Sequence, residues 1–108
     1  MAQDIQIYLG KPQVEKLPVY EVPDGRQVTI KQIIFNNSQD AAQKVTITVN
    51  TIDVMVATVE ANTSSGGAYV RDTFIVLKPG DRLSLKQEKA DAVNVMISGT
   101  SDLLQPLY

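Results

Sequence analysis

Side chains that commonly carry out chemistry are few in this sequence of 108 residues. It contains no histidine and no cysteine, which excludes Ser-His-Asp and Cys-His catalysis, disulfides and thiolate metal sites. A pair of carboxylates could still act as acid and base, as in glycosidases. However, Asp24, Asp40, Asp81 and Asp91 lie in or beside expected turns, where aspartate is favoured for its local hydrogen bonds. We therefore expect that the protein is not an enzyme.

Two further aspartates, Asp53 and Asp72, lie in strand-like segments, where each is expected to face solvent. No Asp-x-Asp/Asn-x-Asp/Asn-Gly loop is present, so calcium held between two loops stays open only as a weak alternative. Tyr8, Tyr20 and Tyr69 could stack on sugars, although tyrosine on a strand more often packs along an edge. We expect neither a metal ion nor a cofactor.

Charge is dispersed along the chain, with ten basic and twelve acidic residues and a net charge of −2. No Lys/Arg tract is available to neutralise a phosphate backbone, so nucleic acid is not an expected partner. No run of 18 or more apolar residues occurs, so we expect no membrane partner. The first residues show neither a basic segment nor an apolar one, so we expect no secretory signal.

The elements that position these side chains are expected to be strands. About eight short segments alternate apolar and polar residues, with turn signals every 8–12 residues and no convincing helix. A hydrophobic content of 44% with only 6% aromatic residues indicates one aliphatic core. The sequence predicts an all-β protein with a single antiparallel β-sandwich, either immunoglobulin-like or jelly-roll.

We expect the centre of this sandwich to be an antiparallel hairpin of residues 28–35 and 45–49. A polar turn joins the two segments, and apolar residues at 33–35 suggest cover on both faces there. The apolar phase then moves from odd to even positions, which predicts a bulge or tight turn near Asn50–Thr51. Pro18 marks residues 16–22 as an edge strand or a bend, and residues 69–77, apolar on both faces, are expected to lie centrally. Gly99 is expected to end the last core strand.

The two ends of the chain are the candidate contact sites. We divide the chain into an N-terminal arm or edge strand (1–13), a β-sandwich domain (14–100) and an apolar C-terminal tail (101–108). In the arm, Ile5, Ile7 and Leu9 are expected to share one face. The tail carries Leu103, Leu104, Leu107 and Tyr108, which are costly to leave in water. The ends either fold back on their own sandwich or join neighbouring subunits, and we expect joining.

A longer pattern resembles small virion proteins of tailed bacteriophages. Residues 17–38 contain a strand ending in Val-Pro-x-Gly, followed by an alternating strand that closes on an Asn-Ser turn. A Thr/Val-rich strand follows at residues 44–50, a Leu-x-Pro-Gly-Asp-x-Leu turn at 77–83, and a last strand at 94–99. The resemblance covers roughly residues 17–99. It consists of turns and strands and includes no active site.

This resemblance implies a structural component of a tailed-phage virion, either a capsid decoration protein or a neck, collar or tail accessory protein. It implies other virion proteins as partners, a homo-oligomer such as a trimer, and location in the virion after synthesis in the host cytoplasm. The alternative is a carbohydrate- or surface-binding β-sandwich module. That alternative expects exposed aromatic residues in a groove, and the sequence has no tryptophan.

Overall fold

The computed structural model describes residues 2–39, 41–60 and 69–104 of the chain. Every helix or strand found among them is a β-strand, as expected for an all-β protein. The strands are β1 (Ala2–Gly10), β2 (Leu17–Glu21), β3 (Arg26–Asn37), β4 (Gln43–Val49), β5 (Ile52–Val59), β6 (Tyr69–Leu77), β7 (Arg82–Gln87) and β8 (Val93–Leu103).

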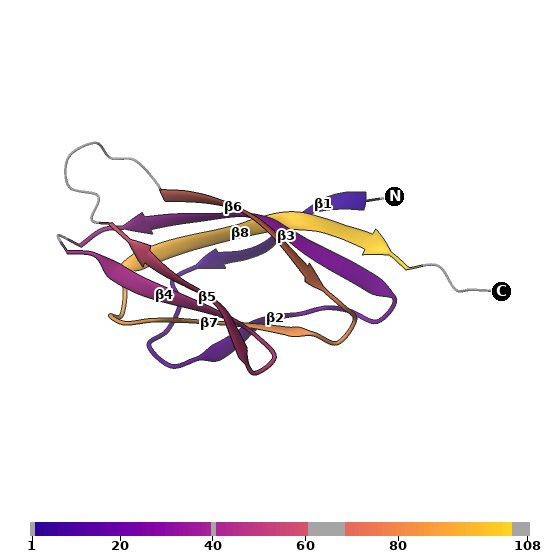
Figure 1. Ribbon diagram of the computed structural model, residues 1–108, viewed down its shortest axis with the longest axis horizontal. Helices are drawn as coiled ribbons and strands as arrows, with labels where there is room; N and C mark the ends of the chain where they lie inside the picture. Colours follow the sequence, from indigo (N-terminus) through magenta and orange to yellow (C-terminus); the bar gives the residue numbers. More distant parts are fainter. Residues whose placement is uncertain (1, 40, 61–68, 105–108) are drawn as a thin grey trace.

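The strands form two four-stranded antiparallel sheets packed face to face (Figure 1). Sheet A has the order β1-β8-β3-β6, and sheet B has the order β2-β7-β4-β5. The pairs β1–β8, β2–β7, β3–β6 and β4–β5 are nested, as if one long hairpin had been wrapped around itself. This winding is that of a jelly roll. The predicted β-sandwich is therefore confirmed, and the jelly roll is the form that it takes.

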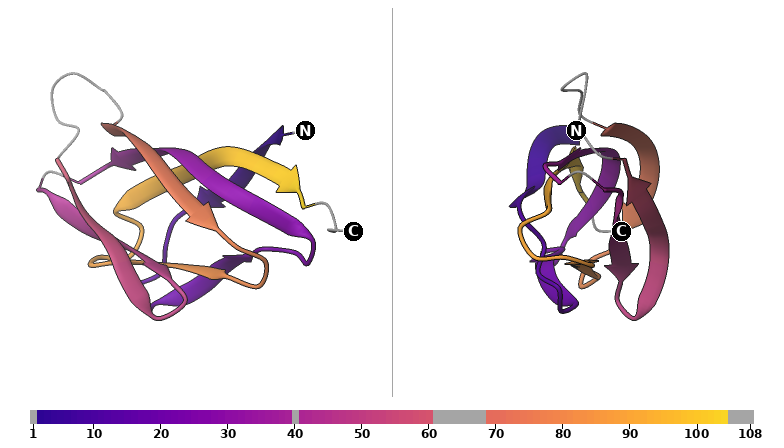
Figure 2. Two further views of the ribbon diagram at one scale, coloured as in Figure 1. Left: turned by 45° about the vertical axis from the view of Figure 1, so that its right-hand side comes forward. Right: turned by 90° about the vertical axis from the view of Figure 1, so that its left-hand side faces the viewer.

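The predicted central hairpin is wrong, because its two strands belong to different sheets. β3 pairs with β8 and β6, whereas β4 pairs with β5 and β7. The polar segment after β3 carries the chain from one layer to the other (Figure 2). Buried Asn37 stabilises this connection between the layers, because its Nδ2 donates hydrogen bonds to the carbonyl oxygens of Ala41 and Val59. Polar turn residues fit such an arch as well as they fit a hairpin.

The position predicted for residues 69–77 is also wrong, because β6 is an edge strand of sheet A. Leu77 is fully buried, but Phe74 and Val76 on the other side of the strand are 75% and 42% exposed. β2, by contrast, is an edge strand as Pro18 predicted. The two-sided apolar pattern of β6 therefore does not reflect cover within the described chain.

Beta-bulges explain two irregular patterns in sheet A. β3 has an extra residue at Lys31 relative to β8, so Ile30 and Ile33 both face the core although three positions separate them. After this change of phase, Ile33 and Phe35 face the core and Ile34 faces the outer side, where it is half-buried. Residues 33–35 are therefore not covered on both faces as expected. β1 has its own extra residue beside Ile97–Ser98.

The bulge of β1 also separates residues that were expected to share a face. Ile7 is 6% exposed and belongs to the core, and Tyr8 follows it onto the inner side. Leu9, two positions beyond Ile7, is 64% exposed on the outer side. The alternation expected for Ile5, Ile7 and Leu9 is therefore wrong, because the register shift reverses the phase between Gln6 and Tyr8.

Gly99 lies inside β8, which continues to Leu103, so the expected strand end is wrong. A Cβ atom at this position would lie 1.9 Å from the carbonyl oxygen of Thr29. The glycine is therefore needed because the backbones of β8 and β3 approach closely beside the bulge at Lys31.

Other turns are as expected. Asn50 adopts a φ of 58° in the two-residue connection between β4 and β5. Gly25 and Gly80 also have positive φ, in turns closed by the Arg26 N–H···O=C Pro23 and Asp81 N–H···O=C Lys78 bonds.

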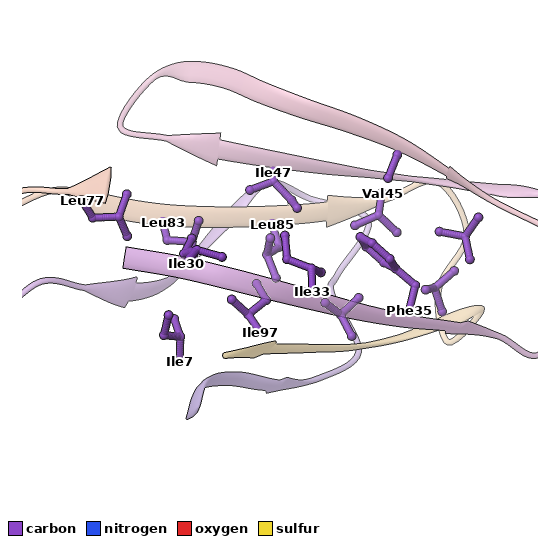
Figure 3. Packing of buried hydrophobic residues seen from close by; sticks show 14 of the residues in the cluster. Ile7, Ile30, Ile33, Phe35, Val45, Ile47, Leu77, Leu83, Leu85 and Ile97 are labelled. Atoms are coloured by element: carbon purple, nitrogen blue, oxygen red, sulfur yellow. The ribbon is translucent and has the colours of Figure 1, made fainter. Parts of the chain in front are cut away.

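The core lies between the two sheets and is almost entirely aliphatic. Figure 3 shows how side chains from both layers meet there, among them Ile33 and Phe35 of β3 and Leu85 of β7, all 0–1% exposed. On β4, Val45 and Ile47 are fully buried, whereas Thr46 between them is half-buried on the outer side.

Replacing Ile47 with alanine should therefore lower the free energy of unfolding by about 2–4 kcal/mol, as for other buried aliphatic residues. The matched variant Thr46→Ala should change it by less than about 1 kcal/mol. Urea denaturation followed by circular dichroism measures both. Equal losses for the two variants would show that the inner and outer faces of β4 have been assigned wrongly.

Candidate functional site

The N-terminal contact residues predicted from sequence lie in the sandwich of their own chain. β1 pairs along its length with β8, which buries Ile7 and packs Ile5 against the core. In a single chain, Ile7 is therefore not on the surface. Leu9 is the member of this set that remains highly exposed.

The C-terminal contact residues are partly described. Leu103 and Leu104 are 59% and 43% exposed, while Leu107 and Tyr108 lie outside the described residues. The end of β8 is attached to the start of β3 by the Leu104 N–H···O=C Gly25 bond of 2.7 Å. Leu9 lies level with Met96, whereas Leu103 lies level with Arg26 at the other end of sheet A. The structure does not bring the two predicted contact sites together.

A row of apolar side chains crosses the outer face of sheet A, the face turned away from sheet B. Leu9 of β1 is opposite Met96 of β8, Met96 is opposite Ile34 of β3, and Ile34 is opposite Val70 of β6. Leu9 and Val70 are 64% and 50% exposed, and the two central residues are half-buried. We call these four residues the apolar row. Sequence reasoning missed it because only the strand order places the four side chains in line.

Phe74 and Val76 are further exposed apolar side chains on the outer side of the edge strand β6, separated from Val70 by Asp72. Phe74 is 75% exposed, the highest value among the exposed large apolar residues of the described chain. It lies where β6 gains a residue relative to β3, and the neighbouring Thr73 Oγ1 donates to the carbonyl oxygen of Ile30 at 2.8 Å. The bulge therefore holds Phe74 outward from the edge of the sheet.

A shallow hollow of about 490 Å³ lies on the same outer face. It is lined by Asp4, Ile5, Gln6, Lys31, Met96, Ser98, Gly99 and Thr100. The bulges of β1 and β3 flank β8 at Ser98, so the hollow lies where both neighbouring strands change phase. Neither the Asp4 carboxylate nor the Lys31 ammonium group forms an ion pair or side-chain hydrogen bond with another described residue.

The outer face of sheet B has a different character, because it carries ion pairs. Lys16 Nζ lies 2.7 Å from Asp53 Oδ1, and Thr48 Oγ1 donates to the same oxygen at 2.7 Å. The hydrogen bond from Lys16 is the main cause of the lowered pKa of Asp53. Exposed apolar residues occur here mainly on the edge strand β5, at Ile52, Val54 and Val56.

Two turns are joined by a polar cluster around Asp81. Its Oδ2 accepts the backbone N–H of Lys78 at 2.8 Å, and its Oδ1 accepts Asn50 Nδ2 at 3.1 Å. These two hydrogen bonds, the first being the larger cause, lower the pKa of the Asp81 carboxyl group. The backbone N–H of Arg82 donates in turn to Asn50 Oδ1. The carboxylate therefore helps to fix the β4–β5 and β6–β7 connections to each other.

The remaining chemical candidates do not converge. Asp72 accepts a hydrogen bond from Gln32 at 3.2 Å, on the opposite sheet from Asp53. Burial raises the pKa of the half-buried Tyr8, and the Tyr69 ring lies 5.9 Å from the ring of Phe35. Among residues 2–39, 41–60 and 69–104, no three metal-ligating side chains form a group. The same described part of the chain has no helix long and apolar enough to cross a membrane.

Comparisons with known proteins give little further information. No protein-family model matches the sequence, and a search of the curated proteins gives no significant match. Among solved structures, one similar chain is from "Structure of infectious bursal disease virus Gt strain", with a TM-score of 0.42 and 12% sequence identity. The alignment covers 94% of the present chain but 32% of that chain, so this chain spans about a third of its length. A likeness at this level carries no argument about function.

Stability should depend on pH through Asp81. Because its pKa is lower in the folded chain than in the unfolded chain, its contribution is present above the unfolded value of about 4 and is lost as the pH falls below it. Asp81→Asn should therefore melt at a lower temperature than the unmodified protein at pH 7, and the difference should shrink towards about pH 3.

The matched control for this measurement is Lys78→Ala. It retains the backbone N–H that donates to Asp81 and removes only the weaker attraction of the Lys78 ammonium group, so it should keep most of the pH dependence of the unmodified protein. An Asp81→Asn protein whose melting temperature stays equally far below that of the unmodified protein from pH 7 to pH 3 would contradict the assignment.

Proposed function

We propose that this chain is a non-enzymatic structural module that works by assembling with other protein surfaces, as a component of a tailed-phage virion. The observation that carries the proposal is the outer face of sheet A. There an apolar row crosses all four strands and Phe74 projects from the edge. Single exposed apolar residues are ordinary, but several exposed apolar side chains gathered on one face of a sheet, beside an open edge, are typical of a protein–protein contact.

The pattern of residues 17–99 supports the virion part of the proposal, through its resemblance to small virion proteins of tailed bacteriophages. The jelly-roll winding is compatible with it, since such sandwiches build viral capsids as well as lectins. The proposed positions are capsid decoration or a neck, collar or tail accessory. The proposed partners are other virion proteins and further copies of this chain, in a homo-oligomer.

A second candidate is a carbohydrate- or surface-binding module, and the hollow is the observation that favours it. Its volume of about 490 Å³ is in the range of small-molecule sites, and its lining offers a carboxylate, an amide, an ammonium group and hydroxyls. No aromatic side chain is among the lining residues, however. A sugar would therefore lack the flat stacking surface that such modules commonly provide. For this reason we place assembly first.

Mass spectrometry of purified virions tests the proposal. Peptides of this chain should be present in intact particles at a ratio to the major capsid protein that stays constant through repeated density-gradient purification. A host protein of similar abundance should be depleted over the same steps and is the control. Loss of this chain together with the host protein would contradict the virion role.

A further inference from the structure

The outer face of sheet A can be matched to itself. An axis parallel to the strands and midway between β8 and β3 exchanges β1 with β6 and β8 with β3, because the sheet order is β1-β8-β3-β6. Rotation by half a turn about this axis leaves each level along the strands unchanged. The apolar row is therefore superimposed on itself, with its two highly exposed ends, Leu9 and Val70, exchanging places.

We propose that a second copy of this chain docks on the outer face of sheet A and forms a two-fold symmetric, face-to-face pair. In this pair, Leu9 lies against Val70 of the second copy, and Met96 lies against Ile34 of the second copy. The inference deepens the proposed assembly function, since it names the surface and the partner. The inference rests on the proposed function only in assuming that the exposed apolar face makes a protein–protein contact.

Shape supports a second copy as the occupant. The hollow lies on the half of the face formed by β1 and β8, and Phe74 projects from β6 on the other half. Both lie at the level of the bulges. On β3, Lys31 lies between Ile30 and Gln32. On β6, Phe74 lies between the residues that pair with these two, Ile75 and Asp72. The same rotation that superimposes the apolar row brings Phe74 of each copy towards the hollow of the other. An isologous interface requires that each projection of one copy meets a recess of the other, as Phe74 and the hollow do here.

Charge also agrees with this arrangement. Asp4 and Lys31 line the hollow without an ion-pair partner among the described residues. The rotation places β3 over β8 of the second copy, so the Lys31 ammonium group is carried towards the hollow in which Asp4 of the second copy lies. Two equivalent attractions of opposite charge therefore form in one pair, although the same rotation also carries Asp72 of β6 over β1, at the level of Gln6.

The size of the face is sufficient for a dimer. Its strands contain 9 to 12 residues, and four strands of this length cover roughly 600–700 Å² in projection, at about 3.3 Å per residue and about 4.8 Å per strand. Accessible surface exceeds its projection, so the face is comparable with the about 800 Å² per partner of a standard interface.

The unmodified full-length chain should sediment as a dimer in analytical ultracentrifugation, with a monomer present on dilution. Phe74→Ala should weaken dimerisation at least about a hundredfold, because each dimer then loses two aromatic side chains from the contact. The matched control is Val56→Ala, which removes a 57% exposed apolar side chain from the edge of sheet B. It should leave the dimer constant unchanged. Both positions are exposed, so thermal melting should show that both variants remain folded.

The charge pair allows a rescue experiment. Lys31→Asp alone should weaken the dimer about tenfold or more, because it replaces the ammonium group that faces Asp4 of the second copy with a carboxylate. The exchange variant Asp4→Lys/Lys31→Asp should recover most of the affinity, which a merely structural role of either residue would not produce. An exchange variant as weak as the single variant would contradict the proposed pairing.

Orientation can be tested by crosslinking, because the natural sequence has no cysteine. Leu9 and Val70 of one chain lie three strands apart, about 14 Å, which is too far for a disulfide within the chain. The variant Leu9→Cys/Val70→Cys should therefore form a disulfide-linked dimer on mild oxidation, whereas the single variant Leu9→Cys should not.

Several outcomes would overturn the inference. A monomer at every concentration would do so, as would a dimer that Phe74→Ala leaves intact or that Val56→Ala also disrupts. Binding of a sugar in the hollow of a monomeric chain would favour the second candidate function instead. These measurements use the isolated chain, whereas the virion proposal is tested on particles. A monomer that is nevertheless a constant component of virions would therefore remove the inference and leave the proposed function.

Discussion

The close approach of β8 and β3 at Gly99 is the constraint on which sheet A depends. A side chain at Gly99 would overlap the carbonyl oxygen of Thr29, so the two central strands meet there without an intervening Cβ atom. β8 alternates regularly past this point, while β1 and β3 each gain one residue beside it, around Ile7 and Lys31. These two bulges decide which side chains face the core. Without the bulge in β3, Ile33 and Phe35 would turn from the core to solvent.

The same constraint shapes the outer face. The bulge in β3 leaves Lys31 on the rim of a hollow, and the longer path of β6 at the same level holds Phe74 away from the sheet. Beyond the bulges, the new phase aligns Ile34 with Met96 and extends their line to both edges as the apolar row. The packing of the core and the proposed contact surface thus both follow from the register shifts of β1, β3 and β6 at this level.

Sequence patterns predicted the strands and turns of this fold well, because those features depend on neighbouring residues. The all-β class, the edge position of β2 and the turn at Asn50 follow from alternation, from Pro18 and from residues that tolerate positive φ. The pairing of strands did not follow. Alternation shows which side chains share a face, but it does not show which strand lies beside β3.

The errors in placing β6 and the contact site have the same origin. Apolar residues on both sides of a strand show that both sides need cover, and the described chain covers only the side of Ile75 and Leu77. The pattern is equally satisfied by a neighbouring molecule, which is how we interpret Phe74 and Val76. The apolar row gave no local signal, because each strand contributes only one of its residues and the chain neighbours of that residue face the other side of the sheet. The four side chains line up only across strands.

Methyl NMR spectra recorded over a dilution series test the central claim most directly, because they report on individual side chains of the outer face. The account predicts concentration-dependent shifts of the methyl groups of Leu9, Ile34, Val70 and Met96, with those of Val54 and Val56 on sheet B unchanged. Shifts centred on Val54 and Val56, or spectra that do not depend on concentration, would contradict it.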